Sequence, residues 1–155
     1  KNVINYHGDN AIRYQKLDDL CSDVNDLIFI KSDVDGFDYD VIFSGFNLIE
    51  KFKPIIYFEA QFNVKEDLCN YMDLLEKLYN FGYNYIVLFD NFGEVFYSGK
   101  VSLVLIRGFF EYVASQNFGK AARTIYYFDI LICSSNEVIE VSKIIDLYMD
   151  SYNYL

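Results

Sequence analysis

The pattern of apolar and polar residues predicts a strand over residues 27–34, because a run of apolar residues leads directly into a group of acidic residues. Most of this run is apolar, and Asp33, Asp35 and Gly36 stand at its end. A nearly continuous apolar run is typical of a strand buried on both faces of a parallel sheet. Open α/β sheets bind their ligands beyond the carboxyl ends of such strands. The pattern therefore predicts a buried strand that delivers carboxylates to a ligand crevice.

A helix and a second strand are predicted to follow at once. Apolar residues return at helical spacing over residues 38–52, and Pro54 then ends the helix. The apolar run 55–59 predicts a strand that again ends in a carboxylate, that of Glu59. Strand, acid, helix, strand and acid in this order make up half of a doubly wound α/β domain with a site at its rim.

The rest of the chain completes one α/β domain over residues 1–155, without an internal repeat or a linker. The further predicted elements are a short strand at 11–15, a short helix at 17–21, a helix around 68–78 that ends at Gly82, strands at 85–89 and 94–97 joined by a turn, a helix at 102–116 capped by Ser102, a basic loop at 119–123, a strand at 126–133 and a closing helix around 139–149.

Composition narrows the class of partner. Hydrophobic residues make up 53% of the chain, with 15 Tyr and 15 Phe, so we expect either an unusually aromatic core or a surface that is buried in a longer protein or an oligomer. The net charge of −10 argues against nucleic acid and against an anionic membrane surface as partners. No apolar run approaches the roughly 18 residues that a membrane span requires. We therefore expect a soluble protein.

The cysteines indicate a reducing compartment. Cys21, Cys69 and Cys133 are odd in number and far apart, and the lone His7 cannot complete a histidine-rich metal site. We expect three buried, reduced thiols in a cytoplasmic protein. No residue is assigned to a resident metal.

Three carboxylates are the candidates for chemistry. Asp33 and Asp35 are two residues apart and would point the same way in an extended backbone, and Glu59 would lie within reach on the neighbouring parallel strand. Such a group can accept a substrate proton, hold a divalent cation or bind a ligand hydroxyl. Alternatively, Asp33 or Asp35 caps the following helix. Lys31 is either a partner that keeps an aspartate ionised or a solvated charge at the strand edge.

The order of these motifs resembles the C-terminal half of an FkbM-type methyltransferase. The resemblance covers roughly residues 11–133, and its most specific part is the run from Lys31 through Asp33, Val34, Asp35 and Gly36. Asp35 stands where the family usually has Glu. The other resembling segments are 16–20, 26–30, 37–38, 41–45, 53–59 and 128–131.

The resemblance implies a fold, a cofactor and a reaction. It implies a partial class I methyltransferase-like, Rossmann-like open sheet, mostly parallel with an antiparallel C-terminal strand and helices packed on it. Related enzymes bind S-adenosylmethionine on a seven-stranded sheet and transfer its methyl group to a hydroxyl, commonly on a sugar or a secondary metabolite. The family's first strand, its glycine-rich loop and its ribose-binding acid would precede Lys1. We therefore expect a fragment that corresponds to the C-terminal half of the domain.

The resemblance also implies roles for particular residues. Asp33, Asp35 and Glu59 are the expected catalytic residues, and Ser32 and Asp33 the expected contacts to S-adenosylmethionine. We expect the isolated chain to bind this cofactor weakly or not at all, and the acceptor to be a small molecule or a glycan. The competing hypothesis is a non-catalytic module that uses the same half-fold for assembly or binding.

The absence of upstream strands would also affect association. In the family's fold the strand over residues 27–34 is central, so here we expect it to lie at an exposed edge. Such an edge would be covered either by a second copy in a homo-oligomer or by residues 1–15.

Overall fold

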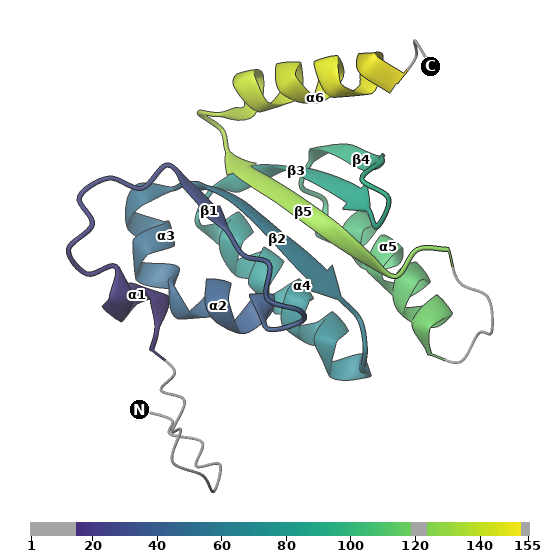
Figure 1. The fold of residues 1–155 in the computed structure, drawn as a ribbon, viewed down its shortest axis with the longest axis horizontal. Helices are drawn as coiled ribbons and strands as arrows, with labels where there is room; N and C mark the ends of the chain where they lie inside the picture. The colour runs from purple at the N-terminus through teal and green to yellow at the C-terminus, as the bar shows by residue number, and fades with distance from the viewer. Residues whose placement is uncertain (1–14, 119–123, 153–155) are drawn as a thin grey trace, which may run out of the picture.

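A five-stranded open sheet with helices on both faces forms the protein in a computed structural model that describes residues 15–118 and 124–152 (Figure 1). The predicted α/β class is therefore confirmed. Two predictions lie outside the described residues, namely the strand at 11–15, apart from its last residue, and the loop at 119–123. The strands are β1 (Phe29–Lys31), β2 (Ile55–Gln61), β3 (Tyr83–Asp90), β4 (Val95–Lys100) and β5 (Tyr127–Ser134), and the helices are α1 (Leu17–Leu20), α2 (Asp38–Ser44), α3 (Phe46–Phe52), α4 (Lys65–Asn80), α5 (Leu103–Asn117) and α6 (Val138–Tyr152).

The strand order is β1-β2-β5-β3-β4, and the expectation of a mostly parallel sheet is wrong. The β1–β2 pair is parallel, but the three other pairings in the described sheet are antiparallel. The reason is that β5, the last strand, enters between β2 and β3 and runs against both, while β4 returns from β3 as a hairpin. Because β5 opposes both neighbours, β1, β2 and β3 still point the same way. Their carboxyl ends therefore meet at one edge.

The strand β1 is short and lies at one end of the described sheet, as expected for an edge. It is not buried on both faces, so that part of the prediction is wrong: Ile30 is 8% exposed, but Phe29 is 48% exposed and the preceding Ile28 is 76% exposed. Although this run is apolar, only part of it is buried in the described structure. It leaves apolar surface at the sheet edge.

The predicted helix over 38–52 is two helices, because the chain bends at Gly45. A Cβ atom on Gly45 would lie 2.7 Å from Leu17 Cδ2 and 3.2 Å from Leu17 Cβ, so a larger residue here would require the Leu17 side chain to move. The Leu17 N–H also donates to Ser44 Oγ at 3.0 Å. Asp18 then caps α3 from 30 residues away, since its Oδ1 accepts from the Leu48 N–H at 3.0 Å. The break is thus enforced by tertiary contact rather than by local sequence.

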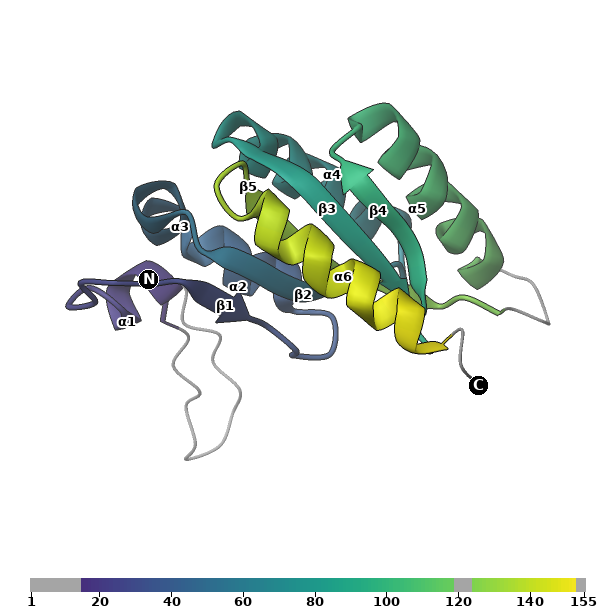
Figure 2. The same cartoon turned by 90° about the horizontal axis from the view of Figure 1, so that it is seen from above.

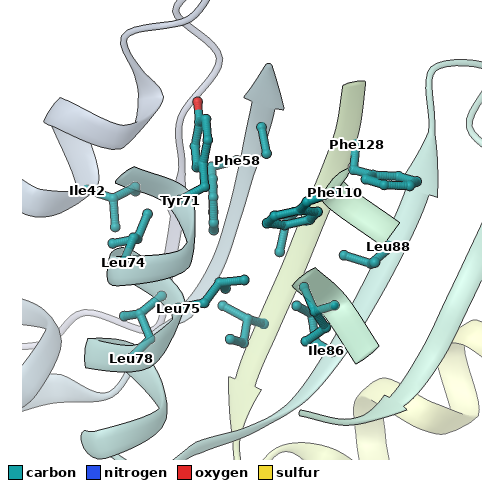
Figure 3. Close-up of a cluster of buried hydrophobic side chains, with 14 of the residues drawn as sticks. Ile42, Phe58, Tyr71, Leu74, Leu75, Leu78, Ile86, Leu88, Phe110 and Phe128 are labelled. Atoms are coloured by element: carbon teal, nitrogen blue, oxygen red, sulfur yellow. The ribbon is translucent and has the colours of Figure 1, made fainter. Parts of the chain in front are cut away.

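The main core lies between the sheet and the helices α2 to α5 (Figure 3). Residues Ile56, Phe58 and Ala60 of β2 point into it, whereas their neighbours in sequence point to the opposite face. The rings of Phe62 and Phe110 lie 4.8 Å apart between their centroids, so part of the aromatic surplus is in the core.

A smaller cluster joins α6 to the other face of the sheet, through Val141 and Ile145. Seen from this side, α6 crosses β5 and β3, while β1 and β2 lie beside it (Figure 2). At the start of β2, Ile55 packs against the same cluster.

The loop between β1 and α2 adopts left-handed backbone angles, with φ of 50° at Asp35 and 93° at Gly36. We predict that Gly36→Ala lowers the free energy of unfolding by about 1–2 kcal/mol, because an L-residue is strained in this region. The matched control is Gly108→Ala inside α5, where an added Cβ meets nothing within 4 Å. That change should raise stability by about 0.5–1 kcal/mol. Urea unfolding of both variants measures the difference, and equal effects would contradict the assigned loop conformation.

Candidate functional site

A row of three carboxylates crosses the sheet on the face opposite the main core. Glu59 of β2 is paired in register with Asp129 of β5, and Asp33 follows β1, the other neighbour of β2. Directly opposed residues in an antiparallel pair place their Cβ atoms about 4.5–5.5 Å apart. We refer to Asp33, Glu59 and Asp129 as the acid band. It lies toward the carboxyl ends of β1 and β2, where an open α/β sheet binds ligands.

Two carboxyl groups of the acid band, those of Glu59 and Asp129, have raised pKa values. Partial burial raises the pKa of Glu59, and the neighbouring Asp129, Asp38 and Asp33 raise it further, against a hydrogen bond from Gln61 that lowers it. Partial burial likewise raises the pKa of Asp129, while the Tyr57 hydroxyl and Lys31 act in the opposite direction. Carboxylates in this state accept protons more readily than solvated ones. Glu59 and Asp129 can therefore receive a proton or a hydrogen bond from a ligand.

Asp33 and Asp35 do not project together as expected. The strand ends at Lys31, and the left-handed turn at Asp35 and Gly36 replaces the extended backbone on which the expectation rested. Asp33 is exposed and forms an ion pair with Lys31 at 3.2 Å, and both side chains are more than half exposed, so Lys31 both pairs with an aspartate and remains a solvated charge at the strand edge. Such an exposed pair contributes about 0–1 kcal/mol to stability. Asp35 is exposed as well.

Neither aspartate caps the helix. The N-cap position of α2 is Phe37, which makes no side-chain capping bond, so the capping hypothesis for Asp33 and Asp35 is wrong. Asp38 binds the loop instead, since its Oδ2 accepts from the Val34 N–H at 3.4 Å.

Glu59 lies within β2, two residues before its end, rather than at the strand tip. Its Oε1 accepts a hydrogen bond from Gln61 Nε2, and Gln61 Oε1 accepts from Asn63 Nδ2 at 3.1 Å. A Cβ atom on Gly36 would lie 3.4 Å from Gln61 Oε1. A ladder of polar side chains thus runs along β2 from the acid band to the loop after β1.

Two buried polar side chains lie beside this loop. Asp38 is fully buried and Ser32 is 4% exposed, and neither Asp38 Oδ1 nor Ser32 Oγ has a hydrogen-bond partner among the described residues. A buried polar atom without a partner costs about 1–3 kcal/mol, so such atoms are candidates for contact with a ligand or a water. Ser32 was a predicted cofactor contact, whereas Asp38 was not assigned a role.

Asp129 is the other site residue that the sequence prediction missed. The available signal was a single acid inside the apolar strand Tyr127–Ser134, but its position beside Glu59 depends on the strand order. Within the described ranges, no three His, Cys, Asp or Glu side chains are placed to hold a metal ion. Two surface hollows, of about 260 and 400 Å³, lie between α4 and α5 and beside the start of α6, and neither is lined by the acid band.

The cysteines are free, as predicted, but only Cys133 is buried; Cys21 is half-buried and Cys69 is exposed. The expectation of three buried thiols is therefore wrong. In the part of the chain that the structure describes, no helix has the length and apolarity of a membrane span.

The described fold is an open α/β sheet with acidic side chains near the carboxyl ends of its parallel pair, which is where α/β domains bind their ligands. Comparison with known families makes the assignment specific, because the model of the methyltransferase FkbM domain matches residues 6–85, just over half of the chain. The protein therefore belongs to the FkbM methyltransferase family. The match contains β1, β2 and the start of β3, but not β5. No curated protein and no solved structure matches the chain significantly.

The raised pKa values of Glu59 and Asp129 predict a pH dependence. The folded protein binds protons to Glu59 and Asp129 more tightly than the unfolded chain does. The contribution of these two groups to stability is therefore fully present below the pKa values of the unfolded chain, and it is lost as the pH rises through the higher pKa values of the folded protein. Asp129→Asn should raise the free energy of unfolding at pH 7 by about 0.5 kcal/mol, by relieving repulsion across the strands.

This gain should shrink as the pH is lowered toward about 4, where carboxyl groups protonate. Urea unfolding across this range measures it, with Asp146→Asn on the exposed side of α6 as control. A loss of stability at pH 7 would show that the Asp129 carboxylate has a net stabilising role.

Proposed function

We propose that the protein acts as an S-adenosylmethionine-dependent O-methyltransferase whose acceptor is a hydroxyl group on a sugar or a secondary metabolite. Membership in the FkbM family supports a methyltransferase. The observation that carries the site is the acid band at the carboxyl ends of the parallel pair β1–β2. An antiparallel final strand between β2 and β3 also agrees with the methyltransferase-like sheet that the family resemblance implies.

The described residues fit part of the cofactor. The carboxylate of Asp33 suits the positive charges of S-adenosylmethionine, and the unpartnered hydroxyl of Ser32 can exchange a hydrogen bond with it. Bound S-adenosylmethionine would supply an electrophilic methyl group. Among the described residues there is no glycine-rich turn to donate backbone hydrogen bonds to its carboxylate and ribose groups, so these residues alone would hold only part of the cofactor.

The carboxylates would prepare the acceptor. Glu59 would accept the hydrogen bond of the acceptor hydroxyl and then its proton when the methyl group is transferred to the hydroxyl oxygen. In that transfer the bond between the methyl carbon and the sulfur of S-adenosylmethionine would break, and the neutral thioether would be the leaving group. A carboxyl group with a raised pKa is closer to the range in which general bases work near neutral pH. Asp33 and Asp35 would orient the acceptor or the cofactor from the loop after β1. A cytoplasmic location accompanies the proposal, because all three cysteines are free.

We predict weak cofactor binding by the 155-residue chain alone. Without a turn that grips the cofactor, the dissociation constant should exceed the low micromolar range, which corresponds to about −8 kcal/mol. Isothermal titration calorimetry with S-adenosylmethionine tests this directly. A low micromolar value would show that the chain holds a complete cofactor site and would contradict this prediction.

We predict that Asp33→Asn lowers methyl transfer at least tenfold while the melting temperature stays nearly constant, because Asp33 is exposed and its ion pair is weak. The assay uses the protein with any upstream residues that its gene encodes. Asp40→Asn, at an exposed position in the first turn of α2, is the matched control. A steep fall in melting temperature with unchanged activity per folded molecule would assign Asp33 a structural role instead.

The exposed edge at β1 favours a second candidate function, that of an assembly module. Phe29 and Ile28 expose apolar surface there, and β1 pairs on one side only among the described residues. An unpaired apolar edge is a template for strand pairing with another chain. A homo-oligomer built through this edge is therefore compatible with either function.

For a homo-oligomer we expect light scattering to give a dimer or larger species, with slow hydrogen exchange at the amides of residues 27–32. Introducing charge by Phe29→Lys should return the monomer, whereas Phe92→Lys in the hairpin between β3 and β4 should not. A monomer at high micromolar concentration with rapid exchange of these amides would rule out assembly through this edge.

A further inference from the structure

The loop over residues 33–37, which joins β1 to α2, is exposed along its whole length but is flanked by buried polar residues (Figure 1). Ser32 before it is 4% exposed, and Asp38 after it is fully buried. Ser32 Oγ and Asp38 Oδ1 have no hydrogen-bond partner among the described residues. A buried polar atom without a partner disfavours the conformation that buries it. The observed conformation, which we call the closed form, is therefore penalised at both ends of the loop.

Few interactions hold the loop in the closed form. Among the described residues, a single hydrogen bond ties residues 33–36 to the rest of the chain, from the Val34 N–H to Asp38 Oδ2. Its length of 3.4 Å is beyond the usual range for such a bond. The ion pair between Asp33 and Lys31 is more than half exposed on both sides, so it adds little. The closed form thus rests on two weak interactions.

The loop after β2 provides a comparison at the same edge of the sheet. There Asp67 Oδ2 accepts hydrogen bonds from the N–H groups of Asn63 and Val64, at 2.7 and 2.9 Å. One aspartate therefore holds two backbone groups at short distance. Asp38 holds one backbone group at long distance and leaves its second oxygen without a partner. The loop after β1 is the less firmly held of the two.

The backbone of the closed loop contains a natural hinge. Asp35 has a φ of 50°, in the left-handed region that is unfavourable for a residue with a Cβ atom, and Gly36 beside it has a φ of 93°. Hinges are a few loop residues that absorb a change of φ and ψ while the flanking elements stay in place. On the β1 side the Ser32 N–H donates to Tyr57 O at 2.9 Å, so the chain is fixed just before the loop.

We propose that the loop after β1 is a strap that opens at its left-handed turn. Opening admits water to Ser32 and Asp38 and moves Asp33 away from the acid band. The two buried polar side chains flank the loop, so its displacement is the smallest movement that hydrates both. The opening is a property of the chain by itself. Its effect on methyl transfer rests on the proposed function, because the site that includes Asp33 is complete only in the closed form.

Amide hydrogen exchange of the 155-residue chain under native conditions tests the opening. The Val34 amide should have a protection factor at least tenfold lower than the Val64 amide, which an aspartate also holds. Low concentrations of urea should leave the exchange of Val34 nearly unchanged, because a local opening exposes little surface. Relaxation dispersion in NMR spectra should detect conformational exchange at residues 33–37 and not at residues 63–67.

Ser32→Ala separates an opening strap from a loop that is merely exposed, because it removes a polar group that only the closed form leaves without a partner. We expect the protection factor of Val34 to rise at least threefold, without a fall in melting temperature. The matched control is Ser134→Ala, since Ser134 is also buried but its hydroxyl donates to Glu137 Oε2 at 2.6 Å. The control should lower the melting temperature and leave the exchange of Val34 unchanged.

Asp38→Ala tests the strap in the opposite direction. It removes the hydrogen bond that holds the Val34 N–H, so the protection of this amide should be lost while that of Val64 is kept. Because Asp38 is fully buried, this variant is read only where its spectrum shows a folded chain, and Ser32→Ala tests the strap independently of it.

Equal protection of Val34 and Val64, or exchange of Val34 only through global unfolding, would overturn the strap. A Ser32→Ala variant that leaves Val34 unchanged or loses stability would overturn it as well. A strap that opens as expected, together with methyl transfer that is unaffected by Asp33→Asn, would leave this inference in place and refute the role of the loop in the proposed function. Methyl transfer that depends on Asp33 in a chain whose loop does not open would refute this inference alone.

Discussion

The antiparallel pairing of β5 with both β2 and β3 is the interaction on which the rest of the structure depends. Ile130 of β5 lies in register with Phe58 on one side and Leu88 on the other, so one strand joins the parallel pair to the hairpin. The alternate side chains Phe128, Ile130 and Ile132 complete the core beneath α4 and α5. Without this strand, the described structure would be two separate pieces of sheet, each with an exposed apolar face.

The same pairing creates the electrostatic character of the outer face. Because β5 lies beside β2, Asp129 opposes Glu59, and two carboxylates share a half-buried environment with one nearby lysine. Like charges placed opposite each other weaken a sheet by some tenths of a kcal/mol, up to about 1 kcal/mol. A protein retains such an arrangement at the expense of stability, which is consistent with a role in ligand binding. The insertion of β5 between β2 and β3 thus both completes the main core and places Asp129 opposite Glu59.

The loop after β1 connects the core to this outer face. Its left-handed turn at Asp35 and Gly36 brings the chain back over the end of β2, and the buried Asp38 binds it through the Val34 N–H. Asp33 lies before this turn, and the side chains of Val34 and Phe37 on either side of it are exposed. A loop of this kind can vary in sequence without disturbing the sheet, and loops that a rigid scaffold positions commonly carry function.

The sequence by itself determined the kind and order of most elements, because periodicities of two and 3.6 residues are local properties. The helix with Leu75 and Leu78 on its apolar face, the Ser102 cap of α5 and the Gly-containing hairpin after β3 could all be predicted in this way. The acidic group after β1 and the family were also accessible, since both depend on residues close together in the chain.

Only the tertiary structure decided which of these elements are neighbours. The break at Gly45 depends on the approach of Leu17, and the cap of α3 comes from Asp18, about 30 residues earlier. The antiparallel insertion of β5 and the placement of Asp129 beside Glu59 join residues 70 positions apart. The burial of Asp38 and the edge position of β1 follow in the same way. Such features depend on strand order and on which faces become covered, and these are set by the packing of the whole chain rather than by any local pattern.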